Sequence, residues 1–375
     1  MVIPGPIYLA QLKWKLGERR GVSTAKGISG RRLLPLFKIG PGAAYDNDRK
    51  CSIEAANHLQ MFGSQMRECW GNNLALIDAS LLEGGDDVHP LALLLGRAAA
   101  AGAVVAPVTG LDLPPTYQDA VKRHVARSKD IHICLRIGLR DLASDRAAGK
   151  IGELLNDLGT EPRKVILLID GGPIYLDGSD RFANALIEAF AHIPTPHSWS
   201  RVFWGCTTFP EKVELQPGQI GMFRRLDWEL YQLLSERADE LPILPMFSDY
   251  GLEYPAQYRA VKAPPSAHLR YSTERDYVVA KGASTKKPNS HKAIYPVASA
   301  LVRNPCFMGP EFSDGNAFIY RLATIQDRTG HSSDWRWAAV DHHLSLVLAQ
   351  LREMYSIPED IEPVLETASG QSLLV

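Results

Sequence analysis

The chain has 375 residues, with 41 Lys and Arg against 42 Asp and Glu, so its formal charge at pH 7 is −1. Hydrophobic residues make up 45% and charged residues 22% of the sequence, which is typical of a globular protein and excludes extensive disorder. The balanced charge excludes a strongly basic nucleic-acid-binding protein, although it leaves a local basic groove open.

Cysteine usage and hydropathy point to a cytoplasmic protein. The five cysteines form no C-x-x-C pair, which favours reduced thiols and argues against a zinc knuckle. The first residues lack the basic and continuous apolar regions of a secretory signal, and no apolar stretch reaches the roughly 18 residues of a membrane span. We therefore expect no membrane partner.

Eight short apolar segments of strand length alternate with helical stretches up to residue 250. The predicted strands are Ile7–Lys13, Leu34–Ile39, Leu74–Asp78, Val104–Thr109, Ile131–Arg136, Val165–Asp170, Arg201–Thr207 and Ile243–Ser248. The predicted helices are Ile53–Cys69, Pro90–Ala101, Thr116–Ser128, Lys150–Leu158, Asp180–His192 and Phe223–Glu240. A helix after the first strand is weakly indicated, because glycines recur between residues 17 and 30.

This alternation predicts an α/β protein with right-handed crossovers and a parallel sheet. Eight repeats favour a closed (β/α)8 barrel of the TIM type. The alternative is an open doubly wound sheet, which often carries a G-x-G-x-x-G turn after an early strand. Gly40-Pro41-Gly42 follows the second strand without a third glycine at the required offset, so dinucleotide binding is disfavoured.

Residues 251–334 break the rhythm and are too long for an ordinary loop. They contain a strand pair around His268–Tyr271 and Tyr277–Ala280, a basic turn with Lys281, Lys286 and Lys287, and a helix near Ala293–Val302. We interpret them as an insertion, folded as a lid over the C-terminal face, between the barrel strands (residues 1–250) and the closing helix (residues 335–355). Residues 356–375 form a tail.

Ligands of such barrels bind at the C-terminal ends of the strands. The polar residues there are Lys13, Lys15, Lys38, Asp78, Thr109, Arg136, Asp170, Thr207, Thr208, Asp249 and Tyr250. The cations suit phosphate or carboxylate oxygens, and the carboxylates suit proton transfer or a divalent metal. Ion pairs that brace the rim are the structural alternative for each residue.

Motifs narrow the chemistry further. There is no H-x-H or H-E-x-x-H pattern, so we predict no metal ligands and no cofactor and leave a divalent metal as the open alternative. Covalent acyl chemistry and a P-loop are disfavoured, because G-x-S-x-G and G-x-x-x-x-G-K-[ST] are absent.

Two further groups of residues each have a functional and a structural interpretation. In Asp341-His342-His343, adjacent helical side chains point about 100° apart, so at most one histidine aims at a shared site for proton transfer; packing on the barrel is the other reading. Arg270-Tyr271, Lys281-Gly282 and Trp335-Arg336 combine cations with aromatic faces, which suits a nucleotide or a single strand as well as ordinary packing.

Several short segments together resemble the phage beta-protein family, found in phages and bacteria and often near genes suspected of phage defence. They are Tyr8–Glu18, Asp227–Tyr231, Ser248–Tyr250, Leu269–Tyr271, Ala280–Gly282, Trp335-Arg336 and His342-His343. The resemblance implies that Lys13, Lys15, Glu18, Asp249, Tyr250, Arg270, Tyr271, Lys281, Arg336, His342 and His343 belong to recurring polar motifs. This sequence departs at Asp314-Gly315-Asn316, where a Gly-Asp pair is expected.

Our first hypothesis is an enzyme or sensor whose barrel mouth binds, and as an enzyme hydrolyses, a phosphate-bearing ligand such as a nucleotide or nucleic-acid end. The predicted ligand-binding residues are Lys13, Lys15, Lys38, Arg136, Tyr250, Arg270, Tyr271, Lys281 and Arg336. The predicted catalytic residues are Asp170, Asp249, His342 and His343. The alternative is a non-catalytic interaction protein in a phage-defence or phage-encoded complex, with mutually paired strand ends and an exposed apolar patch.

Overall fold

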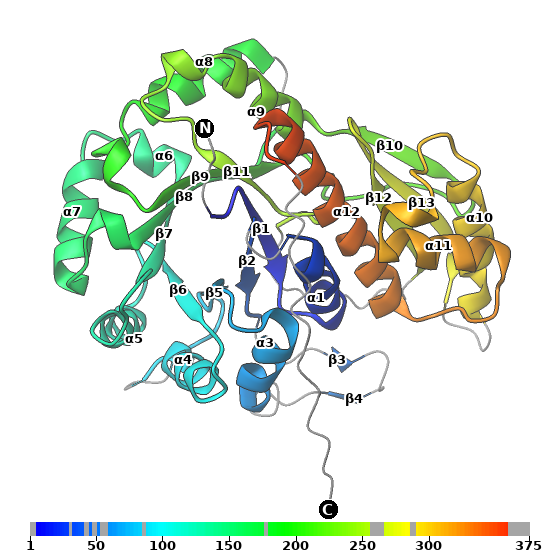
Figure 1. Cartoon of the computed structure of the whole chain (residues 1–375), viewed down its shortest axis with the longest axis horizontal. Helices are drawn as coiled ribbons and strands as arrows, with labels where there is room; N and C mark the ends of the chain where they lie inside the picture. The colour runs from blue at the N-terminus through cyan, green and yellow to red at the C-terminus, as the bar shows by residue number, and fades with distance from the viewer. Residues whose placement is uncertain are drawn as a thin grey trace, which may run out of the picture.

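The computed structural model describes residues 5–29, 32–40, 45–46, 51–52, 59–84, 88–175, 179–255, 266–285 and 290–358. Eight parallel strands close into a barrel in the order β1-β11-β9-β8-β7-β6-β5-β2 (Figure 1), which confirms the predicted fold class. The strands are β1 (Tyr8–Lys13), β2 (Leu33–Lys38), β5 (Ala75–Asp78), β6 (Val105–Thr109), β7 (Ile133–Gly138), β8 (Val165–Pro173), β9 (Arg201–Thr207) and β11 (Met246–Asp249).

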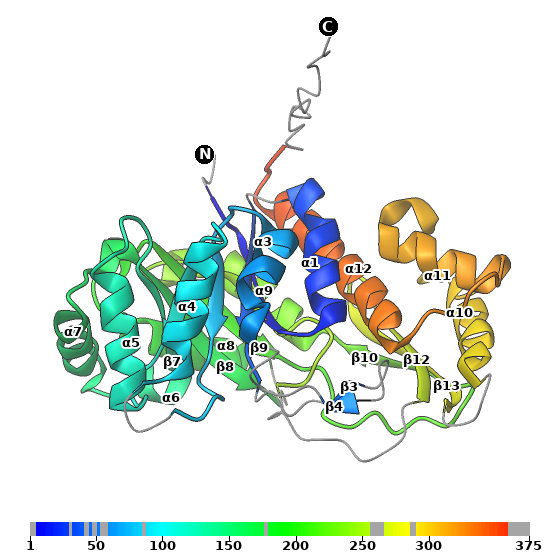
Figure 2. The same cartoon turned by 90° about the horizontal axis from the view of Figure 1, so that it is seen from below.

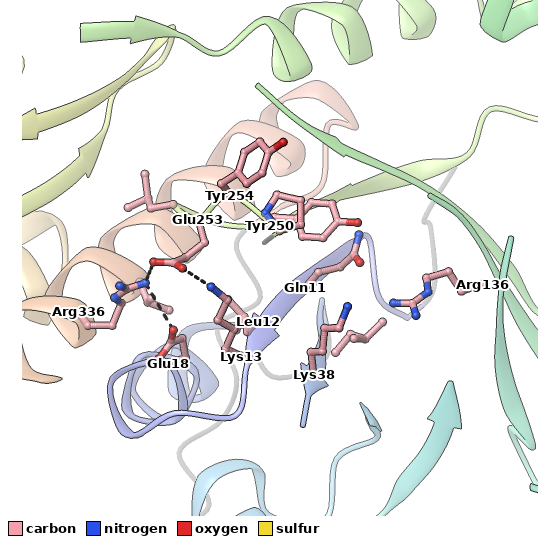
Figure 3. A pocket seen from close by; sticks show the side chains of 14 residues that line it. Gln11, Leu12, Lys13, Glu18, Lys38, Arg136, Tyr250, Glu253, Tyr254 and Arg336 are labelled. Atoms are coloured by element: carbon pink, nitrogen blue, oxygen red, sulfur yellow. Dashed lines mark hydrogen bonds and ion pairs between the residues drawn. The ribbon is translucent and has the colours of Figure 1, made fainter. Parts of the chain in front are cut away.

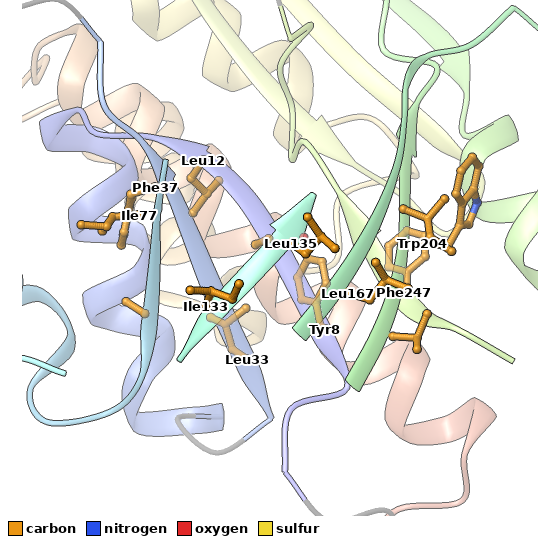
Figure 4. Close-up of a cluster of buried hydrophobic side chains, with 14 of the residues drawn as sticks. Tyr8, Leu12, Leu33, Phe37, Ile77, Ile133, Leu135, Leu167, Trp204 and Phe247 are labelled. Atoms are coloured by element: carbon orange, nitrogen blue, oxygen red, sulfur yellow. The ribbon is translucent and has the colours of Figure 1, made fainter. Parts of the chain in front are cut away.

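Side chains of these strands alternate between the barrel interior and the surrounding helices. One buried cluster contains Leu9, Leu34, Leu36, Leu76, Ala106, Val108, Cys134, Ile166, Leu168 and Phe203. The neighbouring strand residues, such as Tyr8, Phe37 and Phe247, belong to a larger cluster shared with the helices (Figure 4). Because both faces are buried, the strands are apolar at consecutive positions. The first cluster fills the barrel interior and sets which side chains reach the mouth.

The helices around the barrel are α1 (Leu16–Ser29), α3 (Phe62–Trp70), α4 (Pro90–Ala100), α5 (Pro115–Val125), α6 (Leu139–Leu142), α7 (Ala147–Leu158), α8 (Ser179–Phe190), α9 (Leu226–Glu236) and α12 (Ser332–Met354). A two-stranded pair, β3 (Tyr45–Asp46) and β4 (Cys51–Ser52), follows β2. Part of the predicted helix Ile53–Cys69 lies outside the described residues. Among the described helices, none is both long and apolar enough to cross a membrane.

The insertion contributes two strands and helices to a second sheet region, and the third strand, β10 (Ile220–Arg224), comes from the segment between β9 and α9. β10, β13 (Asp276–Ser284) and β12 (Ser266–Ser272) pair in that order, and α10 (Ile294–Val302) and α11 (Asp314–Thr324) pack with them. The prediction that a helix begins at Phe223 was wrong, because residues 220–224 pair antiparallel with β13 and α9 starts only at Leu226. Helix α11 was not predicted.

The described part of the insertion lies beside the barrel, against α12 (Figures 1 and 2). Trp335 and Ala338 of α12 belong to the core of the insertion, whereas Val340, Leu344 and Val347 belong to the core between the barrel and its helices. One helix therefore serves both parts. Residues 256–265 and 286–289 lie outside the described residues, so the lid over the mouth stays a prediction.

Helix α1 packs against α12 through glycines. A Cβ atom on Gly21 would lie 2.5 Å from Cγ1 of Val340, and one on Gly17 would lie 2.5 Å from Cγ of Arg336. These glycines weaken the helix locally, yet they allow the close approach of α12. Packing against α12 explains why a glycine-rich segment still forms a helix.

We expect Gly21→Ala to lower the free energy of unfolding by up to about 2 kcal/mol. Overpacking against Val340 costs about 1–3 kcal/mol, and the gain of about 1 kcal/mol in helix propensity offsets part of this cost. The matched control is Gly152→Ala in α7, where a new Cβ meets nothing within 4 Å; it should be neutral or stabilising. Urea denaturation of both variants measures the difference, and equal effects would contradict the packing argument.

Candidate functional site at the barrel mouth

Strand alternation brings cations from three strands to the mouth. Lys38 follows the interior residue Leu36 by two positions, and Lys13 follows Leu9 by four. Arg136 has the same inward phase on β7. Asp249, in contrast, has the outward phase and turns toward α12. The barrel geometry thus selects some predicted residues for the mouth and directs others away from it.

A cavity of about 40 Å³ opens at this end of the barrel (Figure 3). Its lining consists of Gln11, Leu12, Lys13, Glu18, Leu36, Lys38, Arg136, Tyr250, Leu252, Glu253, Tyr254, Pro255, Arg336 and Val340. Four cations and two carboxylates therefore line it, together with aromatic and apolar side chains. A water needs roughly 10–15 Å³ on this measure, so the enclosed part holds about three waters or one small polar group.

Glu253 is the central acceptor of the mouth. Its Oε2 accepts a hydrogen bond from Nζ of Lys13 at 2.6 Å, and its Oε1 accepts from Nη1 of both Arg270 and Arg336. Arg336 also lies 3.5 Å from Oε1 of Glu18. Burial would raise the pKa of Glu253, but the three cations outweigh burial and hold the pKa well below its ordinary value.

A second set of pairs occupies the opposite side of the mouth. Nη1 of Arg136 donates to Oδ2 of Asp78 at 2.7 Å, and the Tyr250 hydroxyl donates to Oδ1 of Asp170 at 2.5 Å. Burial would raise the pKa of Asp78, yet Arg136 and Lys38 lower it. Desolvation lowers the pKa of Lys38. Asp170 thus reaches the cavity only through Tyr250.

Asp249, predicted as catalytic, lies in a buried network outside the cavity. It accepts hydrogen bonds from the Tyr8 hydroxyl at 2.6 Å and lies 2.9 Å from Nε2 of His343, whose Nδ1 lies 2.7 Å from Oγ of Ser272. The order Asp-His-Ser matches that of a hydrolase triad. All three side chains are at most 1% exposed, so the serine reaches no substrate. The network connects β1, β11, β12 and α12.

His342 and Tyr271 also pack inside the molecule. Their rings stack with centroids 3.7 Å apart, and Nε2 of His342 donates to the carbonyl oxygen of Ser272 at 2.7 Å. Burial lowers the pKa of His342 to about 3, so the ring is neutral at pH 7. The Tyr271 hydroxyl accepts from the backbone N–H of Met308 and from Nδ2 of Asn316. Both residues join the insertion to α12.

The remaining predicted residues lie elsewhere. Lys15 immediately precedes α1, where desolvation lowers its pKa and Glu18 acts on its charge. Lys281 is in β13, where its backbone pairs with that of Gln219, and neither lysine lines the mouth cavity. In the Asp314-Gly315-Asn316 segment, where this sequence differs from the expected family pattern, the N–H of Gly315 donates to Oδ2 of Asp341 at 2.7 Å. That motif therefore docks α11 on α12.

Glu253 and Gln11 line the mouth but were not predicted as site residues. Glu253 lies in a turn, three positions after Tyr250, and strand periodicity therefore does not predict where its side chain lies. Among the described residues, no group of three or more His, Cys, Asp or Glu side chains is arranged to hold a metal ion.

The chain is similar to one protein family and to several solved structures. The profile of the family described as Beta protein matches residues 8–349. A triosephosphate isomerase from Bartonella henselae is 14% identical, with a TM-score of 0.33, over 66% of this chain and 92% of that chain. A putative lyase/mutase from Burkholderia cenocepacia J2315 is 16% identical, with a TM-score of 0.31, over 67% and 78%. No curated protein matches.

We expect His342 to make folding less favourable in acid. Its pKa is about 3 in the folded protein and about 6.5 when unfolded, so between these values the unfolded state binds more protons and stability falls as pH falls. His342→Gln keeps an N–H donor but removes this titration. The variant should be less stable than wild type at pH 7.5. The difference between their free energies of unfolding should decrease toward pH 5, by at most about 1.4 kcal/mol per pH unit.

Urea denaturation at several pH values measures the gap. His192→Gln, at an exposed position, is the matched control and should show no such narrowing. A gap that stays constant from pH 7.5 to pH 5 would show that His342 is not a source of the acid sensitivity.

Proposed function

The chain belongs to the Beta protein family, and we propose that its barrel mouth binds a phosphate-bearing ligand, either a nucleotide or the end of a nucleic-acid strand. The observation that carries this proposal is the cavity lined by Lys13, Lys38, Arg136 and Arg336, which come from β1, β2, β7 and α12. Cations that converge from four elements suit an oxyanion with several oxygens.

The aromatic and apolar side chains of the cavity favour a nucleotide over a bare anion. Tyr250, Tyr254 and Pro255 line it together with Leu252. Tyrosine rings stack on bases and contribute about 1–3 kcal/mol per base in single-strand binding proteins. A ligand that places phosphate oxygens beside the cations of the enclosed part, and a flat ring against the tyrosines outside it, therefore suits both kinds of side chain.

The arrangement supports binding more than hydrolysis. Asp249, His342 and His343 are buried outside the cavity, and the carboxylates that line it, Glu18 and Glu253, both lie beside Arg336. The three cations around Glu253 hold its pKa well below the ordinary value, so this carboxylate is a weak general base. We therefore propose a sensor or carrier of the ligand. A role in phage defence rests on the family resemblance alone.

The alternative, an interaction protein without a small ligand, has one observation in its favour. Strand-end side chains pair with one another or with nearby groups, as in Arg136 with Asp78, Tyr250 with Asp170, and Lys13 with Glu253. Exposed apolar side chains on the second sheet and its neighbours, Met222, Met308, Tyr320 and Ile325, offer contacts to a protein partner.

A thermal-shift screen separates the two functions. Adenosine 5′-monophosphate and a 5′-phosphorylated single strand, each at 100 times its dissociation constant, would stabilise the protein by about 2.7 kcal/mol. We expect Lys38→Ala to weaken this binding at least tenfold, because one charge-assisted hydrogen bond contributes about 1.5–3 kcal/mol.

Lys150→Ala, the same substitution on the exposed surface of α7, is the control and should bind as wild type does. Titration calorimetry of both variants gives the dissociation constants. If no phosphate-bearing probe shifts the transition, or if both variants bind equally well, the mouth is not the anion site and the interaction protein becomes the better proposal.

A further inference from the structure

A second cavity lies between β12 and the first turns of α12. Its volume is about 60 Å³, and it is lined by His268, Arg270, Ser332, Trp335, Arg336 and Ala339. Arg336 lines this cavity and the mouth cavity, whereas Glu18 and Glu253 line only the mouth. We propose that this second cavity binds a tetrahedral oxyanion of the phosphate class, at a site distinct from the barrel mouth.

The charge of the lining carries the proposal. Among the described residues, two guanidinium groups and no carboxylate line the second cavity, whereas four cations and two carboxylates line the mouth. Each guanidinium gives its Nη1 donor to Glu253, which lies outside the second cavity. A guanidinium presents five N–H donors in a planar fork that matches oxyanion geometry. Two such groups from different elements, Arg270 on β12 and Arg336 on α12, provide the donor arrangement of a phosphate site.

Arg270 has donor groups that its hydrogen bonds to Leu252 and Glu253 do not use. Its Nη1 donates to the carbonyl oxygen of Leu252 at 2.6 Å and to Glu253. Its Nε is buried without a hydrogen-bond partner among the described residues. An unsatisfied buried donor is unfavourable, and an oxyanion that accepts from the fork of Arg270 would remove that penalty.

The neutral side chains favour phosphate over sulfate. Nδ1 of His268 lies 2.9 Å from the carbonyl oxygen of Ser266, so Nδ1 carries the proton and Nε2 is left as the acceptor of a neutral ring. Burial and the charge of Arg270 lower the pKa of His268 to about 4. An acceptor nitrogen suits the protonated oxygen of hydrogen phosphate, which sulfate lacks. Ser332 adds a hydroxyl that donates or accepts.

The phosphate group bound in the second cavity comes from one of two sources. The oxyanion is either a free phosphate or the second phosphate of a ligand whose first phosphate occupies the mouth, because Arg336 borders both cavities. The proposal does not depend on a ligand in the mouth, since the second cavity has its own lining of His268, Arg270, Ser332 and Trp335.

The test is calorimetric titration of the full chain with inorganic phosphate and, separately, with sulfate. We expect phosphate to bind more tightly than sulfate, and both His268→Ala and Ser332→Ala to weaken phosphate binding about fivefold to tenfold. Arg270→Lys keeps the charge but removes the fork and should weaken binding at least tenfold. Phosphate should also change the tryptophan fluorescence, and the change should be lost in Trp335→Phe.

Lys38→Ala is the matched control, because Lys38 lines only the mouth. It should leave phosphate binding at the second cavity intact, as followed by the fluorescence change of Trp335, while it weakens binding of adenosine 5′-monophosphate at the mouth. The outcome that overturns the proposal is phosphate binding that is absent at millimolar concentration, or that Lys38→Ala abolishes while His268→Ala and Ser332→Ala leave it unchanged.

Two further titrations identify the source and separate this proposal from the one for the mouth. If adenosine 3′,5′-bisphosphate competes with phosphate and binds more tightly than the monophosphate, one ligand spans both cavities. If monophosphate and phosphate bind together without competition, the oxyanion is a separate ion. Phosphate binding that is sensitive to His268→Ala in a protein that binds no nucleotide would leave the second site standing and reject only the mouth.

Discussion

The mouth of this barrel depends on one carboxylate that holds three cations. Glu253 accepts hydrogen bonds from Lys13 of β1, Arg270 of β12 and Arg336 of α12. These elements are far apart in the sequence. A buried carboxylate is tolerated only when it is paired, and these pairs satisfy it while they join the barrel, the insertion and the closing helix. Because cations outnumber the carboxylate, the same cluster leaves positive charge directed at both cavities.

Much of the barrel was predictable, because a closed parallel sheet imposes a strong constraint on sequence. Strands buried on both faces must be apolar at consecutive positions, as in Val165–Asp170, and helices must separate them. The mouth follows from the same rule. Lys13 and Lys38 end their strands as predicted, whereas β7 continues two residues past Arg136, and all three side chains line one cavity.

The rest depended on the direction of single side chains. Asp249 and Tyr250 are consecutive, so they point to opposite faces, and their identities do not reveal which one faces the mouth. Phe223 occurs in a sequence that also suits a helix, and only its distant partner Tyr277 makes it a strand residue. Glu253 lies in a turn, where no periodicity marks it. Local sequence patterns therefore do not predict long-range strand pairing or the geometry of turns.

Helix α12 has a consequence for how the protein forms during synthesis. Gly21 meets Val340, a partner 319 positions later in the chain, and the core of the insertion also waits for Trp335. Contacts at such sequence separation form late, because the loop between them must close first. On the ribosome, β1 and β11 can pair once residue 249 has emerged, but the face of α1 that packs against α12 and the insertion core stay uncovered until residues 332–354 emerge. A nascent chain that stops short of this helix exposes two apolar surfaces at once, which makes α12 the point at which quality control can distinguish a complete molecule from an incomplete one.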